Sequence, residues 1–356
     1  MIDYGAAPAT DEIEIAVFGP GFGEAIAVHV GEGQWFLVDS CLEPGSKLPA
    51  SHHYLKQLGV SANQVKAIVA SHWHDDHVRG ISELADLYPD ADFLMSSALN
   101  SIEATAFLSA HNAITAPGLS RGATELYKVL QRRANVFHVH QRSSILELVA
   151  NGRNIRVAAL SPVPAAFTQS ILHFAQYLPD KKGGSPVNHA PELKPNLEAI
   201  AIHIDFDGDA ALLGSDLEDH HSCGWTAVVS DAWCAARHPG SAYKVAHHGS
   251  RTGEQPEIWT TLLEQSPSIS MTPFNLGSVK LPTDEDRVRI RSKSKAAYIS
   301  SGASKRPEMD AAVLKRLGDV CNKLTRVNAG FGAIRLRKQI SVRTWTPELF
   351  GDACTL

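Results

Sequence analysis

Apolar and polar positions near the N-terminal end of the chain follow the pattern of a β-sheet. Residues 12–18 begin with charged and apolar side chains in alternation, and residues 25–30 and 35–38 form two further apolar runs. Turns that contain glycine separate these three runs, as in successive hairpins. The pattern therefore predicts three neighbouring strands that open one sheet.

A fourth apolar run, at residues 65–70, leads directly into a cluster of histidines. Its β-branched residues predict a buried strand. Three imidazoles and a carboxylate then crowd the following turn: His72, His74, Asp76 and His77. These groups are ligands of zinc and similar cations, and positions i and i+2 of an extended segment face the same side. A solvated histidine-rich loop is the alternative, but position, residue type and density together favour a metal site.

The second half of the chain also reads as strands with helices between them. The predicted strands there are 135–140, 145–149, 155–160, 197–206, 210–213, 243–246, 268–272, 297–300, 333–336 and 340–343. Two such halves predict the α/β class, as an αββα sandwich of two mixed β-sheets with outer helices. We expect a single domain over residues 1–356, with a helical insertion at about 97–135 and a loop insertion at about 161–195.

Composition narrows the cellular setting. The net charge of -5 gives no global basic signature for nucleic acid. No apolar run approaches the roughly 20 residues that a membrane helix requires, and the first residues lack the pattern of a secretory signal. The five cysteines are scattered, odd in number and without a CxxC pair, which favours free thiols in a reducing cytosol. We therefore expect a cytoplasmic protein without a membrane partner.

Two later segments match the histidine motif in order and type. Residues 211–216 read Ala-Leu-Leu-Gly-Ser-Asp, and residues 243–250 read Tyr-Lys-Val-Ala-His-His-Gly-Ser. With the histidine motif they resemble the metallo-β-lactamase fold superfamily of metallo-hydrolases. The form Lys-Val-x-His-His-Gly-Ser is most similar to the soluble ComEC-like branch, related to a domain of the DNA-uptake protein ComEC. Residues 19–25 and 35–40 also resemble the opening hairpin of that branch, so the similarity covers roughly residues 12–290.

The resemblance implies two divalent metal ions, zinc in the first instance. The first would be held by His72, His74 and Asp216, and the second by Asp76, His77, Asp216 and His247. Asp216 can bridge because its two oxygens can each serve one cation. Two ions about 4 Å apart can hold a metal-bound hydroxide and stabilise both sides of a displacement. The resemblance thus implies a metal-dependent hydrolase.

The first metal site lacks one histidine that the wider superfamily supplies. Asn196 stands at that point, as an asparagine does in ComEC-like domains, and its amide oxygen is a weaker and harder ligand than imidazole. Manganese or magnesium would then suit this weaker site. His189, in the expected loop insertion, is an alternative ligand.

The remaining candidate residues surround the metal motif. His247 directly follows a predicted strand and is taken as the ligand, so His248 would face the substrate with Ser250 and Arg251 as an anion pocket. Asp76 and His248 are the residues to which we assign catalytic roles. Asp39 ends the third strand, where it either supports a ligand imidazole or serves as a turn residue.

Two basic features bear on the substrate. Arg121, Lys128, Arg132 and Arg133 form a stripe on a predicted helix, and basic residues alternate along 287–295 as they would on one face of a strand. Either feature could contact phosphates, but a charge run on a helix is usually a solvated face, and a solvated strand face is the alternative for residues 287–295. The strip at 287–295, with the two-metal arrangement and the ComEC-like motifs, favours a phosphodiester in nucleic acid or a nucleotide as the substrate. The alternatives are an ester, thioester or lactam, and a non-catalytic, metal-stabilised binding or sensor module with protein partners in a multi-component system.

Overall fold

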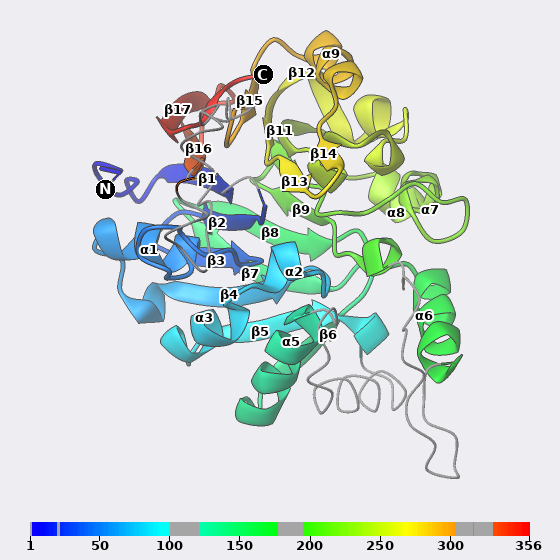
Figure 1. Cartoon of the computed structure of the whole chain (residues 1–356). Coiled ribbons are helices and arrows are strands. Elements are labelled where there is room, and N and C mark those ends of the chain that lie inside the picture. Colours follow the sequence, from blue (N-terminus) through cyan, green and yellow to red (C-terminus); the bar gives the residue numbers. More distant parts are fainter. Residues whose placement is uncertain (1, 20–21, 100–120, 177–194, 303–315, 317–329) are drawn as a thin grey trace.

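Two eight-stranded sheets pack face to face in the computed structural model (Figure 1). The structure describes residues 2–19, 22–99, 121–176, 195–302, 316 and 330–356. The first sheet has the order β17-β16-β1-β2-β3-β4-β5-β6, and the second has the order β18-β15-β12-β11-β10-β9-β8-β7. Both sheets are mixed, because parallel pairs such as β3–β4 and β10–β11 lie beside antiparallel ones.

The strands of the first sheet are β1 Glu12–Gly19, β2 Ala25–His29, β3 Trp35–Val38, β4 Val65–Ala70, β5 Asp92–Ser96, β6 Val136–Val139, β16 Gly332–Gln339 and β17 Thr346–Gly351. Those of the second are β7 Ser144–Ala150, β8 Arg153–Ala159, β9 Ile202–Asp205, β10 Ala210–Leu213, β11 Gly240–Lys244, β12 Leu263–Met271, β15 Ala297–Ile299 and β18 Cys354–Thr355. A separate hairpin joins β13 Phe274–Leu276 to β14 Val279–Leu281.

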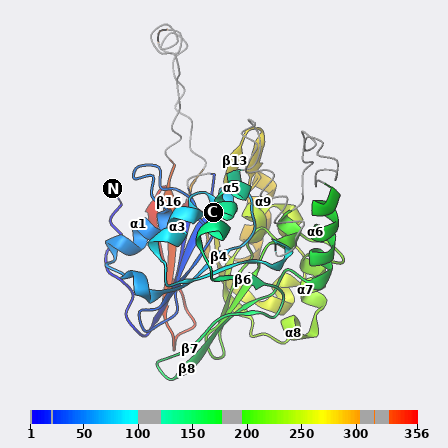
Figure 2. The same cartoon turned by 90° about the horizontal axis from the view of Figure 1, so that it is seen from below.

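The helices lie on the outer faces of the two sheets (Figure 2). They are α1 Ala50–Gln57, α2 Asp75–Val78, α3 Ile81–Leu87, α5 Arg121–Arg132, α6 Pro164–Gln176, α7 Trp225–Ser230, α8 Ala232–Ala235 and α9 Asp284–Lys293. Short turns of other helix types are η1 Ala62–Gln64, η2 Ser97–Leu99, η3 Pro195–Glu198, η4 Ala246–Gly249, η5 Arg251–Gly253 and η6 Ile258–Leu262. No helix in the described part of the chain is long and apolar enough to cross a membrane.

Three apolar clusters of described residues correspond to the three interfaces of a four-layer sandwich. The central cluster joins the inner faces of the two sheets and includes Val69 and Ile204. One outer cluster joins the first sheet to α1 and α3 through Tyr54, and the other joins the second sheet to α7 through Trp225. Strands such as β3 and β10 are buried on both faces, as expected for the middle layers. The αββα sandwich predicted from the sequence is confirmed.

Two segments differ from the predicted elements. Residues 164–176 form helix α6, where the sequence predicted a loop, because Pro164 occupies the first helical turn and needs no amide donor there. The strand face considered for residues 287–295 does not form. That region is helix α9, whose Thr283 and Asp286 form a capping box.

Other differences concern element ends. The strand predicted at 197–206 begins only at Ile202, since residues 195–198 form the turn η3. The strand predicted at 333–336 lies within β16, which is longer, whereas 340–343 is not a strand and the next strand is β17. The helix α5 confirms the helical character of the end of the 97–135 segment, whereas residues 100–120 and 177–194 lie outside the described residues. The single-domain division stays a prediction.

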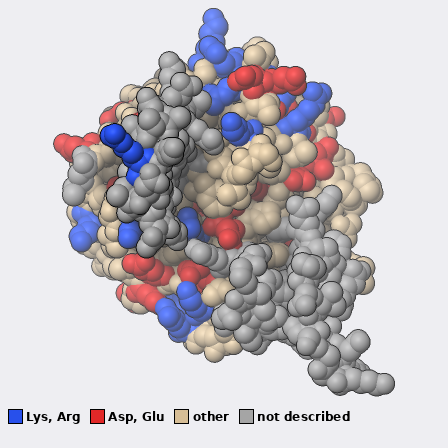
Figure 3. All heavy atoms as spheres, in the orientation of Figure 1, with Lys and Arg blue, Asp and Glu red and all other residues tan. Residues whose placement is uncertain are grey.

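The change at 287–295 removes the predicted basic strip. On a helix, residues two apart point in different directions and residues four apart share a face, so the basic side chains divide between two faces, Arg287 with Arg291 and Arg289 with Lys293. Arg289 also bonds to Glu254, to Asp286 and to the carbonyl of Gly249. On the face shown in Figure 3, the described Lys and Arg side chains lie in separate groups among acidic ones.

The stripe on α5 is similarly engaged. Lys128 pairs with Glu125 at 2.7 Å, and Arg132 pairs with Asp86 at 2.6 Å. Arg133 donates to the carbonyls of Tyr88 and Pro89. These three side chains therefore serve local contacts of the helix.

Candidate metal centre

The candidate ligands gather where strands of both sheets end. His72, His74, Asp76 and His77 follow β4, Asp216 follows β10, and the pair His247–His248 follows β11. Gly214 allows this approach, because a Cβ there would lie 2.8 Å from the amide nitrogen of Ala246. The β10 and β11 ends can therefore pack close enough to bring Asp216 beside the late histidines.

Two groups of possible ligand atoms share Asp216. One contains Asp76, His77, Asp216 and His248, and the other contains His72, His74 and Asp216, with the atoms of each group within 4.8 Å of one another. In the first group, His248 Nε2 lies 3.1 Å from Asp76 Oδ2 and 3.4 Å from Asp216 Oδ2. In the second, His72 Nε2 and His74 Nδ1 face each other at 3.1 Å.

The structure places His248, rather than the expected His247, in the group with Asp76, His77 and Asp216. Both residues have left-handed backbone conformations, with φ of 48° for His247 and 51° for His248. This turn directs the His248 ring inward, where it is 1 % exposed. The His247 ring instead lies near the surface, against Thr252 at 2.9 Å and Glu218 at 3.3 Å. His248 thus does not take the substrate-facing position expected from the sequence.

Asp39 supports the His77 imidazole, which is one of the two roles considered for it. Its Oδ2 accepts hydrogen bonds from His77 Nδ1 and from the Ser71 hydroxyl, each at 2.7 Å. Since His77 Nδ1 donates to Asp39, Nε2 is the ring nitrogen that faces Asp216 Oδ1, at 3.3 Å. Glu24, Asp39 and His77 form a third close group, but Asp39 is already bonded to His77, so we assign no ion there.

The pKa shifts of the histidines and carboxylates at the centre indicate that it favours positive charge. Burial lowers the pKa of His77, but the Asp216, Asp76 and Asp39 carboxylates outweigh it and raise the pKa well above its ordinary value. In the same way, Asp216 and Asp76 overcome burial and raise the pKa of His248 to about 9. Burial raises the pKa of Asp216, yet His248 and His77 hold it well below its usual range. The carboxylates therefore favour positive charge at this centre, which a bound cation would supply.

The donor set fits divalent metal ions. His77 Nε2 and Asp216 Oδ1 are buried without a hydrogen-bond partner among the described residues. Burial keeps the pKa of His72 well below its ordinary value, so this ring is neutral and can offer a lone pair. Buried, unpartnered donors of this kind suit a metal that binds imidazole and carboxylate.

Asn196 lies beside this centre. Its Nδ2 donates to Glu218 Oε1 at 2.9 Å and lies 3.3 Å from His247 Nε2. Its Oδ1 is buried without a partner among the described residues. That oxygen is free to act as a ligand, so its completion of the His72–His74 group stays a prediction. His189 lies outside the described residues.

The expected anion pocket does not form as a unit. The Ser250 hydroxyl accepts from the Thr252 amide at 3.3 Å and caps the turn η5. Arg251 is exposed at the surface, and His248 is buried among the ligands.

The sequence analysis did not identify Glu24 and Lys244, which are both buried. A lysine inside an apolar, buried strand indicates that it contacts a polar partner.

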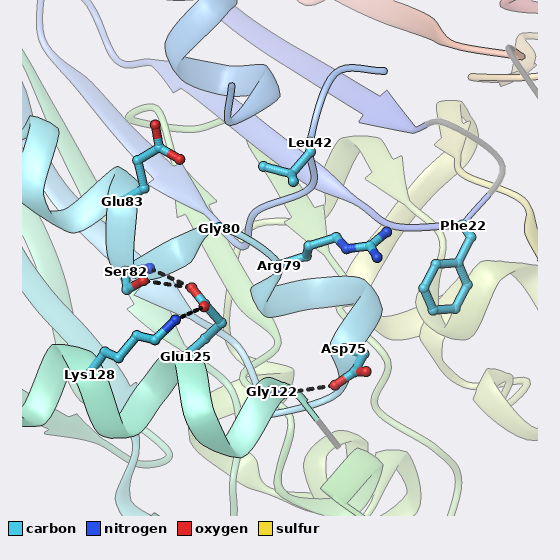
Figure 4. A pocket seen from close by; sticks show the side chains of 10 residues that line it. All are labelled: Phe22, Leu42, Asp75, Arg79, Gly80, Ser82, Glu83, Gly122, Glu125 and Lys128. Atoms are coloured by element: carbon cyan, nitrogen blue, oxygen red, sulfur yellow. Dashed lines mark hydrogen bonds and ion pairs between the residues drawn. The ribbon is translucent and has the colours of Figure 1, made fainter. Parts of the chain in front are cut away.

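A cavity of about 360 Å³ lies next to the histidine loop (Figure 4). It shares Asp75 with that loop, but none of the candidate ligands lines it. Asp75 accepts from the Gly122 amide at 2.6 Å, and Glu125 bonds to Ser82 and Lys128. The remaining lining includes Phe22, Leu42 and Arg79.

Comparison with known proteins identifies the domain. Residues 18–133, which contain the histidine loop, match the sequence model of the metallo-beta-lactamase superfamily. This part of the chain therefore belongs to a metallo-β-lactamase superfamily domain. No functionally curated protein matches the sequence. The superfamily match and the two ligand groups together indicate a site for divalent metal ions.

Several solved structures are similar. A variant of the metallo-beta-lactamase from Cronobacter sakazakii is 13% identical, with a TM-score of 0.31 over 56% of this chain and 60% of that one. The metallo-beta-lactamase SMB-1 is 13% identical, with a TM-score of 0.31 over 60% and 65%. The metallo-beta-lactamase fold protein YhfI from Bacillus subtilis is 13% identical, with a TM-score of 0.37 over 81% and 95%. This chain thus spans less than two thirds of the first two.

Proposed function

We propose that this protein is a metal-dependent hydrolase that cleaves a phosphodiester in a nucleotide or a nucleic acid. The observation that carries the proposal is the sharing of Asp216 between two ligand groups, because two neighbouring cations suit phosphoryl displacement. The proposed ligands are His72, His74, Asp76, His77, Asp216 and His248, with Asn196 proposed as a further ligand through its unpartnered Oδ1.

The metal ions, when bound, would lower the pKa of a water molecule and stabilise the charge that develops on the phosphate. The protein's own residues orient this chemistry. Asp39 holds the His77 ring with Nε2 inward, and Asp76 and Asp216 supply the negative charge that retains cations. The centre lies in a largely buried pocket of polar groups, which strengthens each of these interactions.

The cavity in Figure 4 supports a substrate of nucleotide size. Its volume of about 360 Å³ lies within the usual range for small-molecule sites. The Arg79 side chain extends between Leu42 and Phe22, and no hydrogen bond joins its guanidinium to another described residue of the cavity. Phe22 packs on Phe274 at 5.4 Å, and Phe274 packs on His248 at the same separation. An apolar group and an anion could therefore bind together in this cavity, which Phe22 and Phe274 connect to His248.

The finer assignments belong to this proposal. We infer zinc as the metal, with manganese or magnesium at the His72–His74 group, because Asn196 offers an oxygen where the wider superfamily offers imidazole. The Lys-Val-x-His-His-Gly-Ser motif supports the ComEC-like branch. The cytoplasmic setting rests on the cysteines: the four within the described residues are free, and Cys321 lies outside them.

Metal-loaded protein is expected to hydrolyse phosphodiesters. The panel is bis(para-nitrophenyl) phosphate, cyclic nucleotides, DNA and RNA, each with zinc or manganese. Because both ions stabilise the displacement, removal of metal with a chelator should lower the rate by at least ~10²-fold, and added metal should restore it.

The same panel contains nitrocefin, a thioester and an aryl ester. Metal-dependent turnover of one of these, without turnover of any phosphodiester, would replace the proposed substrate class. At most one weakly held ion and no turnover at all would favour the binding or sensor module.

Arg79→Met should weaken substrate binding with little change in chemistry. A guanidinium–phosphate hydrogen bond is worth ~1.5–3 kcal/mol, so KM should rise about tenfold or more. The kcat should stay within about threefold, because Arg79 lines the cavity and not the ligand groups.

Steady-state kinetics on the best phosphodiester of the panel measure this effect. Arg132→Met, which removes a surface arginine that pairs with Asp86, is the matched control. Equal KM values for the two variants would remove Arg79 from substrate binding.

A further inference from the structure

A charged pair is enclosed between the two sheets, behind the metal centre. Lys244 ends β11 of the second sheet, and Glu24 precedes β2 of the first. Lys244 Nζ lies 2.5 Å from Glu24 Oε2, and both side chains are 0% exposed. Transfer of two charges out of water costs several kcal/mol per ion, so such a pair requires compensating contacts.

Thr272 connects this pair to His248. The Thr272 hydroxyl donates to Glu24 Oε2 at 2.5 Å. His248 Nδ1 lies 3.0 Å from the same hydroxyl oxygen and 3.2 Å from the Thr272 carbonyl oxygen. Thr272 is buried, and so are Glu24, Lys244 and His248. The contacts therefore run without interruption from Lys244 to the His248 ring.

The direction of each hydrogen bond follows from the groups involved. A carboxylate only accepts, so the single hydroxyl proton of Thr272 points to Glu24. Toward His248 the hydroxyl then presents a lone pair, and the Thr272 carbonyl can also only accept. The proton of the neutral His248 ring must therefore sit on Nδ1, which leaves the Nε2 lone pair free.

His248 Nε2 is the atom that faces the metal centre. It lies 3.1 Å from Asp76 Oδ2 and 3.4 Å from Asp216 Oδ2. Glu24 also contacts the loop that carries Asp76, because its backbone N–H donates to the Asp76 carbonyl oxygen at 2.8 Å. One buried residue thus contacts both the loop that carries Asp76 and the support of His248.

We propose that Glu24, held by Lys244 and acting through Thr272, is a positioning device that sets the His248 tautomer for metal binding. This inference rests on the proposed metal centre. Loss of an outer partner of a ligand histidine typically weakens metal affinity ~10–100-fold. A buried ion pair that only joined the two sheets would alter stability and leave metal affinity unchanged.

Thr272→Val should weaken metal binding about tenfold, the lower end of the ~10–100-fold range, because the Thr272 carbonyl remains as an acceptor. Thr272→Ser keeps the hydroxyl and should bind within about threefold of wild type by the same criterion. Glu24→Gln should behave like the valine variant, since an amide can donate to Thr272 and free its proton to turn toward His248. Zinc affinity is measured by competition with a chromogenic chelator, without any substrate.

Ring-nitrogen NMR of zinc-loaded protein supplies a second measurement. The His248 signals, identified by their loss in His248→Gln, should report a protonated Nδ1 and a metal-bound Nε2. Wild-type protein that binds no zinc would contradict the metal centre itself. Wild-type protein that binds zinc while Thr272→Val binds it equally well, or equal losses in the serine and valine variants, would overturn only the positioning role.

Discussion

Asp216→Asn should abolish hydrolysis more completely than any other single substitution at the centre. Asp216 is the residue that both ligand groups share, so its substitution weakens the binding of both ions. An amide keeps the shape but lacks the charge that retains two divalent cations. Loss of several kcal/mol of metal-derived stabilisation corresponds to at least ~10³-fold in rate. Bound metal, measured by elemental analysis after gel filtration, should fall for both ions.

A nearby acid provides the control for this substitution. Asp219 is exposed and accepts hydrogen bonds from Thr226 at 2.9 and 2.7 Å, outside both ligand groups. Asp219→Asn should keep the metal content and the rate of wild type. Thermal melting of both variants in the metal-free state shows whether they fold alike. An Asp216→Asn protein that retains two ions and most of its activity would remove the shared-carboxylate arrangement.

Local patterns predicted much of the fold. Strands such as β3, β4 and β10 are short apolar runs bounded by turns, so their positions follow from composition alone. Helix α6 was missed because it begins at Pro164, two residues after another proline, and prolines usually interrupt a helix. Helix α9 was missed because its capping box, Thr283 and Asp286, lies within a polar run that resembles a loop. Helix propensity of the following residues and the cap decided both cases.

The candidate centre was predictable as a set of residues but not in its detailed arrangement. Spacing along the chain placed His72, His74 and Asp76 together, because all three follow one strand. It could not order His247 and His248, since that depends on two successive residues with positive φ. Such conformations cost ~1–2 kcal/mol per residue and occur where tertiary contacts impose them, so a sequence pattern does not disclose them.

Substitution of the two adjacent histidines separates the predicted ligand from the observed one. His248→Gln should lose one bound ion and reduce the rate by at least ~10²-fold, because the ring belongs to the Asp76–Asp216 group. His247→Gln should keep both ions and retain a rate within about threefold of wild type, since its ring contacts Thr252 and Glu218 near the surface. Each variant removes one imidazole from neighbouring positions, so each serves as the other's control.

The metal content of the two variants decides the assignment independently of the substrate. If His247→Gln loses an ion and His248→Gln keeps it, the ligand is the residue that directly follows the strand, and the buried position of His248 must serve another purpose. If His248→Gln alone loses the ion, the inward turn of the chain after β11 is what completes the centre. The left-handed conformations of both histidines are then maintained by function, because a relaxed turn would carry the His248 ring away from Asp76 and Asp216.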